Sequence, residues 1–139
     1  MSKSAILCVD DEKPVLENLK EQLKSAFGNA YLYAMAEDTD EALELLEEFS
    51  EDKISIVVIV SDWLMPGMKG DEFLILVHQR FPKIVKILLT GQADEVAIER
   101  AIEHANLHLC LHKPWSEEEL ITTIKSALSK LGPNQRSSA

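Results

Sequence analysis

Cysteine and basic residues are scarce in this sequence, and each shortage excludes a class of protein. The only two cysteines, Cys8 and Cys110, lack the paired spacing that metal and redox sites use. We therefore expect buried free thiols in a reducing compartment. Lysine and arginine number 14 against 24 acidic residues, so the formal net charge is −10 and the isoelectric point is about 4.8. Such a chain repels a phosphate backbone, which argues against nucleic acid as a direct partner.

Long apolar runs are also missing. No stretch is long enough to span a bilayer or to form the core of an export signal, and residues 1–5 are mostly polar or small. We therefore expect a cytoplasmic protein without a membrane partner. The 139 residues, of which 46% are hydrophobic and 27% are charged, fit one globular domain with a single core.

The sequence does contain short apolar runs that alternate five times with longer segments of helical period. The expected strands are Ala5–Val9, Tyr31–Met35, Ser55–Val60, Lys86–Leu89 and Leu107–Leu111. This alternation predicts an α/β fold, a doubly wound, five-stranded parallel sheet with helices on both faces. The domain is expected to span residues 1–132, and residues 133–139 to form a flexible tail or the start of a linker.

Five helices are expected between and after these strands, because apolar residues recur there every three or four positions. The apolar stripe of the fourth consists of Ala97, Ile98, Ala101, Ile102 and Ala105. Pro14 suits the first turn of the first helix, and Gly28 suits its end. Ser116 followed by Glu119 predicts a capping box at the start of the fifth helix, and Gly132-Pro133 predicts its end.

Reactive side chains follow the predicted strands at their carboxyl ends, where sheets of this kind bind ligands. Asp10 and Asp11 follow the first strand, Asp62 the third, Thr90 the fourth and Lys113 the fifth. Neighbouring carboxylates repel each other by about 4 kcal/mol per pair at about 4 Å in a medium of intermediate dielectric, so the cluster needs a cation. All-oxygen ligation favours Mg²⁺, which together with the lysine would neutralise a phosphoryl group during transfer.

Four motifs in these loops resemble the receiver domain of response regulators. They are Asp10-Asp11, the run SDWLMPGMKG from Ser61 to Gly70, Thr90-Gly91 and Lys113-Pro114. The resemblance extends from about Ile6 to Leu131, and it implies a flavodoxin-like fold with the strand order 2-1-3-4-5. It also implies a module of two-component signal transduction. Such a module is phosphorylated by a histidine kinase or a histidine phosphotransfer protein and acts on a downstream output protein or a fused output domain.

The resemblance also implies a role for each of the acidic residues. Asp62 would be the phosphoryl acceptor. Asp11, Asp62 and the backbone carbonyl of Leu64 would hold Mg²⁺, or Mn²⁺ in its place, and Asp10 would hold the metal through water. The chemistry agrees with these roles, because a carboxylate is a poor nucleophile until a metal orients it and shields the incoming phosphorus.

The remaining implied roles concern the other strand ends. Thr90 would hydrogen-bond one phosphoryl oxygen and Lys113 would pair with another, and the Lys113-Pro114 bond is expected to be cis. The residues two positions beyond Asp62 and Thr90, Leu64 and Gln92, are expected to influence the lifetime of the phosphorylated state. Cys110 departs from the family, because receivers usually carry Tyr or Phe three residues before the lysine. That departure puts the usual route from the threonine to the output face in doubt.

Other functions remain open. The ending Lys113-Pro114-Trp115 resembles receivers fused to enzymes, so the chain could be the N-terminal regulatory module of a cyclic-dinucleotide phosphodiesterase or a kinase. By itself it is expected to catalyse only its own phosphorylation and dephosphorylation. An aspartate-nucleophile phosphohydrolase would need Asp-x-Asp after the first strand, and Glu12 occupies the last of those positions. His104, His108 and His112 would suggest zinc on a single helix, but we expect the first on the fourth helix and the others on the last strand.

Overall fold

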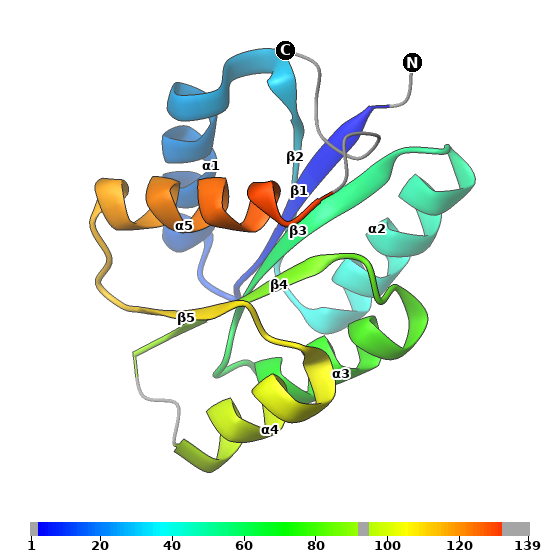
Figure 1. Cartoon of the computed structure of the whole chain (residues 1–139), viewed down its shortest axis with the longest axis vertical. Coiled ribbons are helices and arrows are strands. Elements are labelled where there is room, and N and C mark those ends of the chain that lie inside the picture. The colour runs from blue at the N-terminus through cyan, green and yellow to red at the C-terminus, as the bar shows by residue number, and fades with distance from the viewer. Residues whose placement is uncertain (1–2, 92–94, 132–139) are drawn as a thin grey trace.

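A parallel sheet forms the centre of the computed structural model, which describes residues 3–91 and 95–131 (Figure 1). Its strands are β1 (Ser4–Val9), β2 (Leu32–Ala36), β3 (Ser55–Asp62), β4 (Val85–Thr90) and β5 (Leu109–His112). Their order is β2-β1-β3-β4-β5, and every neighbouring pair is parallel. The predicted flavodoxin-like topology is therefore confirmed.

Helices cover both faces of this sheet (Figure 1). One face carries α1 (Lys13–Phe27) and α5 (Glu117–Ser129), and the other carries α2 (Thr39–Glu51), α3 (Gly70–Arg80) and α4 (Glu95–Ala105). A short 3-10 helix, η1 (Gly28–Ala30), follows α1. Ile59 and Leu88 pack on the α2, α3 and α4 side, whereas Val60 and Leu89 pack on the α1 and α5 side. Because successive side chains of a strand point to opposite faces, the central strands must be apolar on both.

The local signals for helix ends operate as predicted. Pro14 lies in the first turn of α1, and Gly28 caps the end of the helix with a φ of 55°, a conformation that favours glycine. The Ser116 hydroxyl caps α5, accepting the Glu119 backbone N–H at 3.1 Å and donating to the Glu119 carboxylate at 3.2 Å. Gly132-Pro133, predicted to end this helix, lies outside the described residues.

The last strand is shorter than the sequence predicts. The Leu107 N–H bonds to the Ala101 carbonyl at 3.2 Å, and Asn106 has a φ of 53°. This left-handed residue closes the end of α4, so the chain enters β5 at Leu109 and not at Leu107. His108 therefore precedes the strand instead of lying in it. The third strand, in contrast, is longer than predicted, because β3 continues past Val60 as far as Asp62.

Small side chains attach α4 to the rest of the domain. Its buried stripe consists of Ala97, Ala101 and Ala105, whereas Ile102, which the sequence assigns to the stripe, is 54% exposed. Each residue turns a helix by about 100°, so Ile102 lies to the side of the stripe that Ala101 belongs to. Val96 is exposed as well. Among the described residues, no helix combines the length and the apolar character that a membrane span requires.

Candidate functional site

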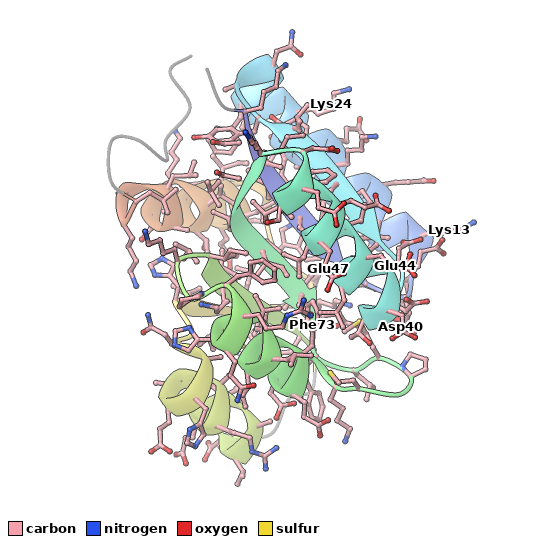
Figure 2. The ribbon with its side chains drawn as sticks, turned by 90° about the vertical axis from the view of Figure 1, so that its right-hand side faces the viewer. Lys13, Lys24, Asp40, Glu44, Glu47 and Phe73 are labelled. Carbon is pink, nitrogen blue, oxygen red and sulfur yellow. The ribbon has the colours of Figure 1, made fainter. Side chains whose placement is uncertain are left out.

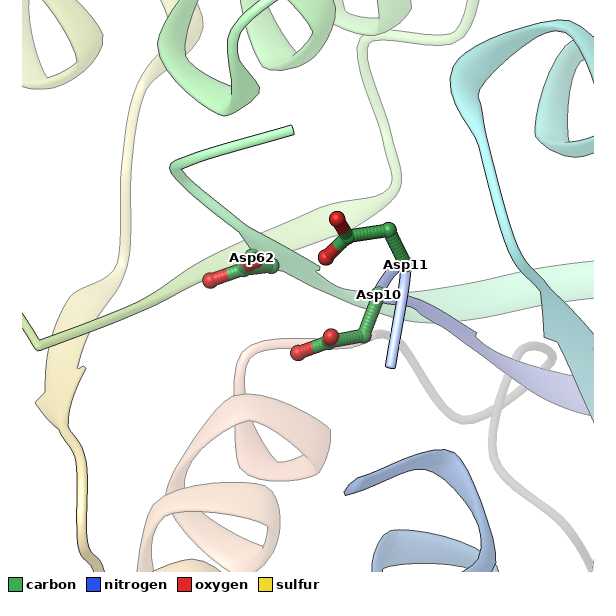
Figure 3. A group of neighbouring side chains, drawn as sticks. All are labelled: Asp10, Asp11 and Asp62. Atoms are coloured by element: carbon green, nitrogen blue, oxygen red, sulfur yellow. The ribbon is translucent and has the colours of Figure 1, made fainter. Parts of the chain in front are cut away.

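Three aspartates meet at the carboxyl ends of the two central strands (Figure 3). Asp10 and Asp11 come directly after β1, and Asp62 is the last residue of the neighbouring β3. One carboxylate oxygen from each lies within 4.8 Å of the other two. Asp10 is fully buried, Asp62 is 5% exposed and Asp11 faces solvent. Negative charge is thus concentrated at the floor of the site, and one carboxylate remains accessible at its edge.

Lys113 is the cation that reaches this cluster from β5. Its Nζ donates to Asp10 Oδ2 at 2.9 Å and lies 3.1 Å from Asp62 Oδ1. The backbone fixes the origin of this side chain, because the Lys113 N–H bonds to the Thr90 carbonyl at 2.8 Å. The following bond to Pro114 is cis, as predicted. Lys113 therefore joins two acids that come from different strands.

Burial and charge change the proton affinities of these groups. Burial and the charges of Asp10 and Asp11 raise the pKa of Asp62 from 3.8 to about 6, although Lys113 acts in the opposite direction. Burial alone would lower the pKa of Lys113, but its hydrogen bonds and its attraction to Asp10 and Asp62 outweigh burial, so that the pKa is raised. At neutral pH the cluster thus holds an ionised Asp62 beside a protonated lysine, which is the charge state that a carboxylate nucleophile needs.

An open cleft of about 480 Å³ lies over the cluster. Its lining includes Asp11 and Asp62 together with Leu64, Thr90 and Lys113. The structure therefore brings every predicted site residue to one place, either in the wall of this cleft or, for Asp10, in the cluster below it. A second cleft, of about 470 Å³, lies at the opposite end of the sheet and is mainly apolar, without a group of acids or histidines. Because the three acids gather at the first cleft, that cleft is the candidate functional site.

The loop from Asp62 to α3 is fixed by a close approach of two backbones. The Gly70 N–H bonds to the Trp63 carbonyl at 2.8 Å. A Cβ at position 70 would lie 2.2 Å from the Asp62 carbonyl oxygen, so no larger residue fits without a shift of the backbone. Gly67 has a φ of 81°, in the region that favours glycine. These two glycines allow the chain to turn from Asp62 into α3 within a short loop.

The donor set of the cluster fits a hard divalent cation. Its ligands are carboxylate oxygens alone, and the open cleft leaves room for the waters and phosphate oxygens that complete the octahedron of Mg²⁺. Among the described residues, His104, His108 and His112 do not form a metal site of their own. Within residues 3–91 and 95–131, the aspartates form the only group of three or more potential metal-binding side chains.

The geometry matches a known family. A family model described as the response regulator receiver domain matches residues 6–125, which is most of the chain. The chain belongs to the response regulator receiver family. Receiver domains are modules of two-component signal transduction and bind Mg²⁺ at an acidic pocket, so the resemblance drawn from the motifs is confirmed.

Solved structures and curated proteins agree with this assignment. The receiver domain of an HD domain-containing protein from Pseudomonas fluorescens Pf-5 is 31% identical, with a TM-score of 0.81 over 94% of this chain and 97% of that one. A CheY-like receiver domain protein from Methanospirillum hungatei JF-1 is 27% identical, with a TM-score of 0.81 over 94% and 96%. The hydrogenase transcriptional regulatory protein HoxA of Cupriavidus necator is 32% identical over 94% of this chain and 25% of its own length.

The receiver domain is shorter than its curated relatives. It spans between 24% and 53% of the length of the first three. Those proteins carry further chain beyond the part that matches, and the activity of a whole relative does not transfer to the receiver alone.

Sequence reasoning missed one ion pair near the site. The buried Asp71 pairs with the half-exposed Arg100 behind the β3–α3 loop, and their separation of 29 positions gives no local signal for it. Cys110 is half-buried in β5 and packs against the core on the α3 and α4 side. Its thiol stands at the position where the resemblance leads one to expect the ring of Tyr or Phe. Gln92, predicted to affect the phosphorylated state, lies outside the described residues.

Proposed function

We propose that Asp62 of this receiver domain accepts a phosphoryl group with the help of Mg²⁺. The observation that carries the proposal is the cluster of Asp10, Asp11 and Asp62 at an open cleft, with Lys113 paired to Asp10 and Asp62. A solvated acidic surface would not need three carboxylates packed this closely, nor a lysine bonded to two of them. A bound cation would offset the repulsion that the cluster creates.

The proposed roles follow the positions of the side chains. Asp11, Asp62 and the Leu64 backbone carbonyl would hold Mg²⁺, or Mn²⁺ in its place, and Asp10 would act through a water molecule. When bound, the metal supplies positive charge that orients the carboxylate and shields the phosphoryl oxygens. Thr90 lines the cleft, which suits a hydrogen bond from its hydroxyl to one of those oxygens.

The proposed transfer is a substitution at phosphorus. A carboxylate oxygen of Asp62 attacks the phosphorus of the donor, and a bond between that oxygen and phosphorus forms. The bond from phosphorus to the donor nitrogen or oxygen breaks, and its electron pair leaves with the donor. The Lys113 ammonium, already 3.1 Å from Asp62 Oδ1, neutralises the charge that builds up on the phosphoryl oxygens. Later attack by water releases phosphate and restores the free carboxylate, so the domain changes only its own state.

The proposed partners are a histidine kinase or a histidine phosphotransfer protein on the donor side and an output protein or fused domain on the other. The curated relatives extend well beyond the matched region, and the similar receiver from Pseudomonas fluorescens belongs to an HD domain-containing protein. The similar segment of the sensor kinase CckA of Brucella abortus, 31% identical, favours as a second candidate a regulatory module of a longer enzyme, such as a phosphodiesterase or a kinase. The free thiols of Cys8 and Cys110 agree with the proposed cytoplasmic location.

Treatment with a small phosphodonor tests the central proposal. Acetyl phosphate or phosphoramidate with Mg²⁺ should add one phosphoryl group to the wild type and none to Asp62→Asn, as measured by the mass of the intact protein. Asp40→Asn removes an exposed carboxylate from α2 (Figure 2) and should be phosphorylated like the wild type. Stoichiometric phosphorylation of Asp62→Asn would assign the acceptor to another residue.

A further inference from the structure

Trp63, the residue after the proposed acceptor, is fixed by four contacts. Its backbone N–H bonds to the Leu89 carbonyl at 2.9 Å, and its carbonyl accepts the Gly70 N–H at 2.8 Å. The indole N–H donates to Asp71 Oδ1 at 3.0 Å, and the Lys69 ammonium lies 5.0 Å from the ring centroid. Trp63 thus connects the backbone at Asp62 to the carboxylate of Asp71 through its indole N–H.

Asp71 is a buried carboxylate with a partner on each oxygen. It lies in the first turn of α3 and is 2% exposed. Oδ1 accepts the Trp63 indole N–H, and Oδ2 accepts from Arg100 Nη1 at 3.0 Å. A buried charge is strongly unfavourable unless it is paired and hydrogen-bonded, so Asp71 resists any movement that removes either partner.

Arg100 carries this network into α4. Its side chain is 47% exposed, so a movement of the pair reaches the surface of the domain. The buried stripe of the helix consists of alanines, and Ile98 packs beside them against the core. The Asp71–Arg100 pair adds one directional polar contact to this apolar packing of α4 against α3. Because breaking the pair would leave Asp71 buried and unpaired, a shift of Asp71 carries Arg100 and α4 with it, which gives α4 the two positions that coupling requires.

We propose that Asp71 is a positioning residue that couples the acceptor site to helix α4 through Trp63 and Arg100. The inference rests on the proposed phosphorylation of Asp62 and adds a route by which it reaches the surface. The half-buried thiol of Cys110 offers no ring to perform this task. The route through Trp63 runs instead behind the β3–α3 loop, on the side of the sheet where α3 and α4 pack together.

Amide and indole chemical shifts of the full chain test the coupling. Mg²⁺ with beryllofluoride, which mimics the phosphoryl group, should shift amides around Asp62 and across α4 in the wild type. In Arg100→Gln the shifts around Asp62 should persist, while those of α4 should fall by about half or more. Arg100→Lys keeps the positive charge and should restore part of the response.

Two further variants separate this network from a general loss of charge. Asp71→Asn keeps an acceptor for the Trp63 indole but loses the charge that attracts Arg100, so it should reduce the α4 shifts as Arg100→Gln does. Arg80→Gln breaks the exposed pair between α3 and Glu47 of α2 and should leave the α4 shifts unchanged. Glu47 lies on α2, as Figure 2 shows.

The Trp63 indole N–H signal reports directly on the Asp71–Arg100 pair, whereas the response of α4 to beryllofluoride is the readout that a purely structural role would not move. The Trp63 signal should shift in Arg100→Gln even without ligand, while the signal of the Trp115 indole, which donates to Gln22 at 2.8 Å, should stay in place. Wild-type shifts confined to the surroundings of Asp62, or α4 shifts of full size in Arg100→Gln, would overturn the inference and leave the phosphorylation site intact. An absence of shifts around Asp62 would instead refute the proposed function.

Discussion

Replacing Asp62 by asparagine should stabilise the metal-free protein most at neutral and higher pH, and less as the pH falls. Burial and the neighbouring acids raise the pKa of Asp62 from 3.8 to about 6. A pKa that is higher in the folded state means that the folded protein binds the proton more tightly than the unfolded chain does. The wild type therefore gains stability as the pH falls through about 6, and the gain is complete below about 3.8.

The magnitude follows from the two pKa values. One pKa unit corresponds to about 1.4 kcal/mol, so the complete contribution is about 3 kcal/mol in the free energy of unfolding. About 1.4 kcal/mol of this total develops between about pH 8 and about pH 5. Both pH values lie above the isoelectric point of about 4.8. Asparagine does not titrate in this range. The stability advantage of Asp62→Asn over the wild type should shrink by that amount between the two pH values.

Urea unfolding in the presence of a chelator, followed by tryptophan fluorescence, measures this difference. Glu44→Gln removes an exposed carboxylate from α2 and controls for the loss of one negative charge (Figure 2). An advantage that is constant between the two pH values, or that grows toward pH 5, would refute the reasoning from burial and charge. Saturating Mg²⁺ should remove or reverse the trend, because the metal binds only the ionised carboxylate.

Mg²⁺ should raise the melting temperature of the wild type, because it binds the folded chain and relieves repulsion among the acids, and Asp11→Ala should lose this response in a thermal-shift titration. Gly70→Ala should lower the free energy of unfolding by about 3 kcal/mol in urea titration, because its Cβ would lie 2.2 Å from the Asp62 carbonyl oxygen. Gly91→Ala, whose nearest neighbour is 3.9 Å away, should cost much less. Leu64→Asn should shorten the lifetime of the phosphorylated protein, measured by phosphate release, because an amide can orient water in the cleft and leucine cannot; an unchanged rate would contradict this.

The sequence by itself determined the order of the elements and the edge at which the chemistry collects. Apolar runs of strand length separated by helical periods leave few arrangements other than a parallel sheet covered on both faces. In such a sheet, residues that follow the strands must converge at one edge. Asp10, Asp62 and Lys113 could therefore be placed together from their positions in the chain. Capping by Ser116 could be predicted too, because it depends on neighbours within four residues.

Only the tertiary structure decided which groups touch and which are buried. Lys86 occupies a predicted apolar strand, yet its ammonium lies 2.8 Å from His78 Nδ1, and burial lowers its pKa to about 8. The exposure of Ile102 depends on how α4 is rotated against its neighbours, which its own helical period cannot fix. The ion pair of Asp71 with Arg100 depends on the packing of α3 against α4. Periodicity encodes the contacts within an element, whereas contacts between elements depend on side-chain volumes and burial that arise only when the whole chain packs.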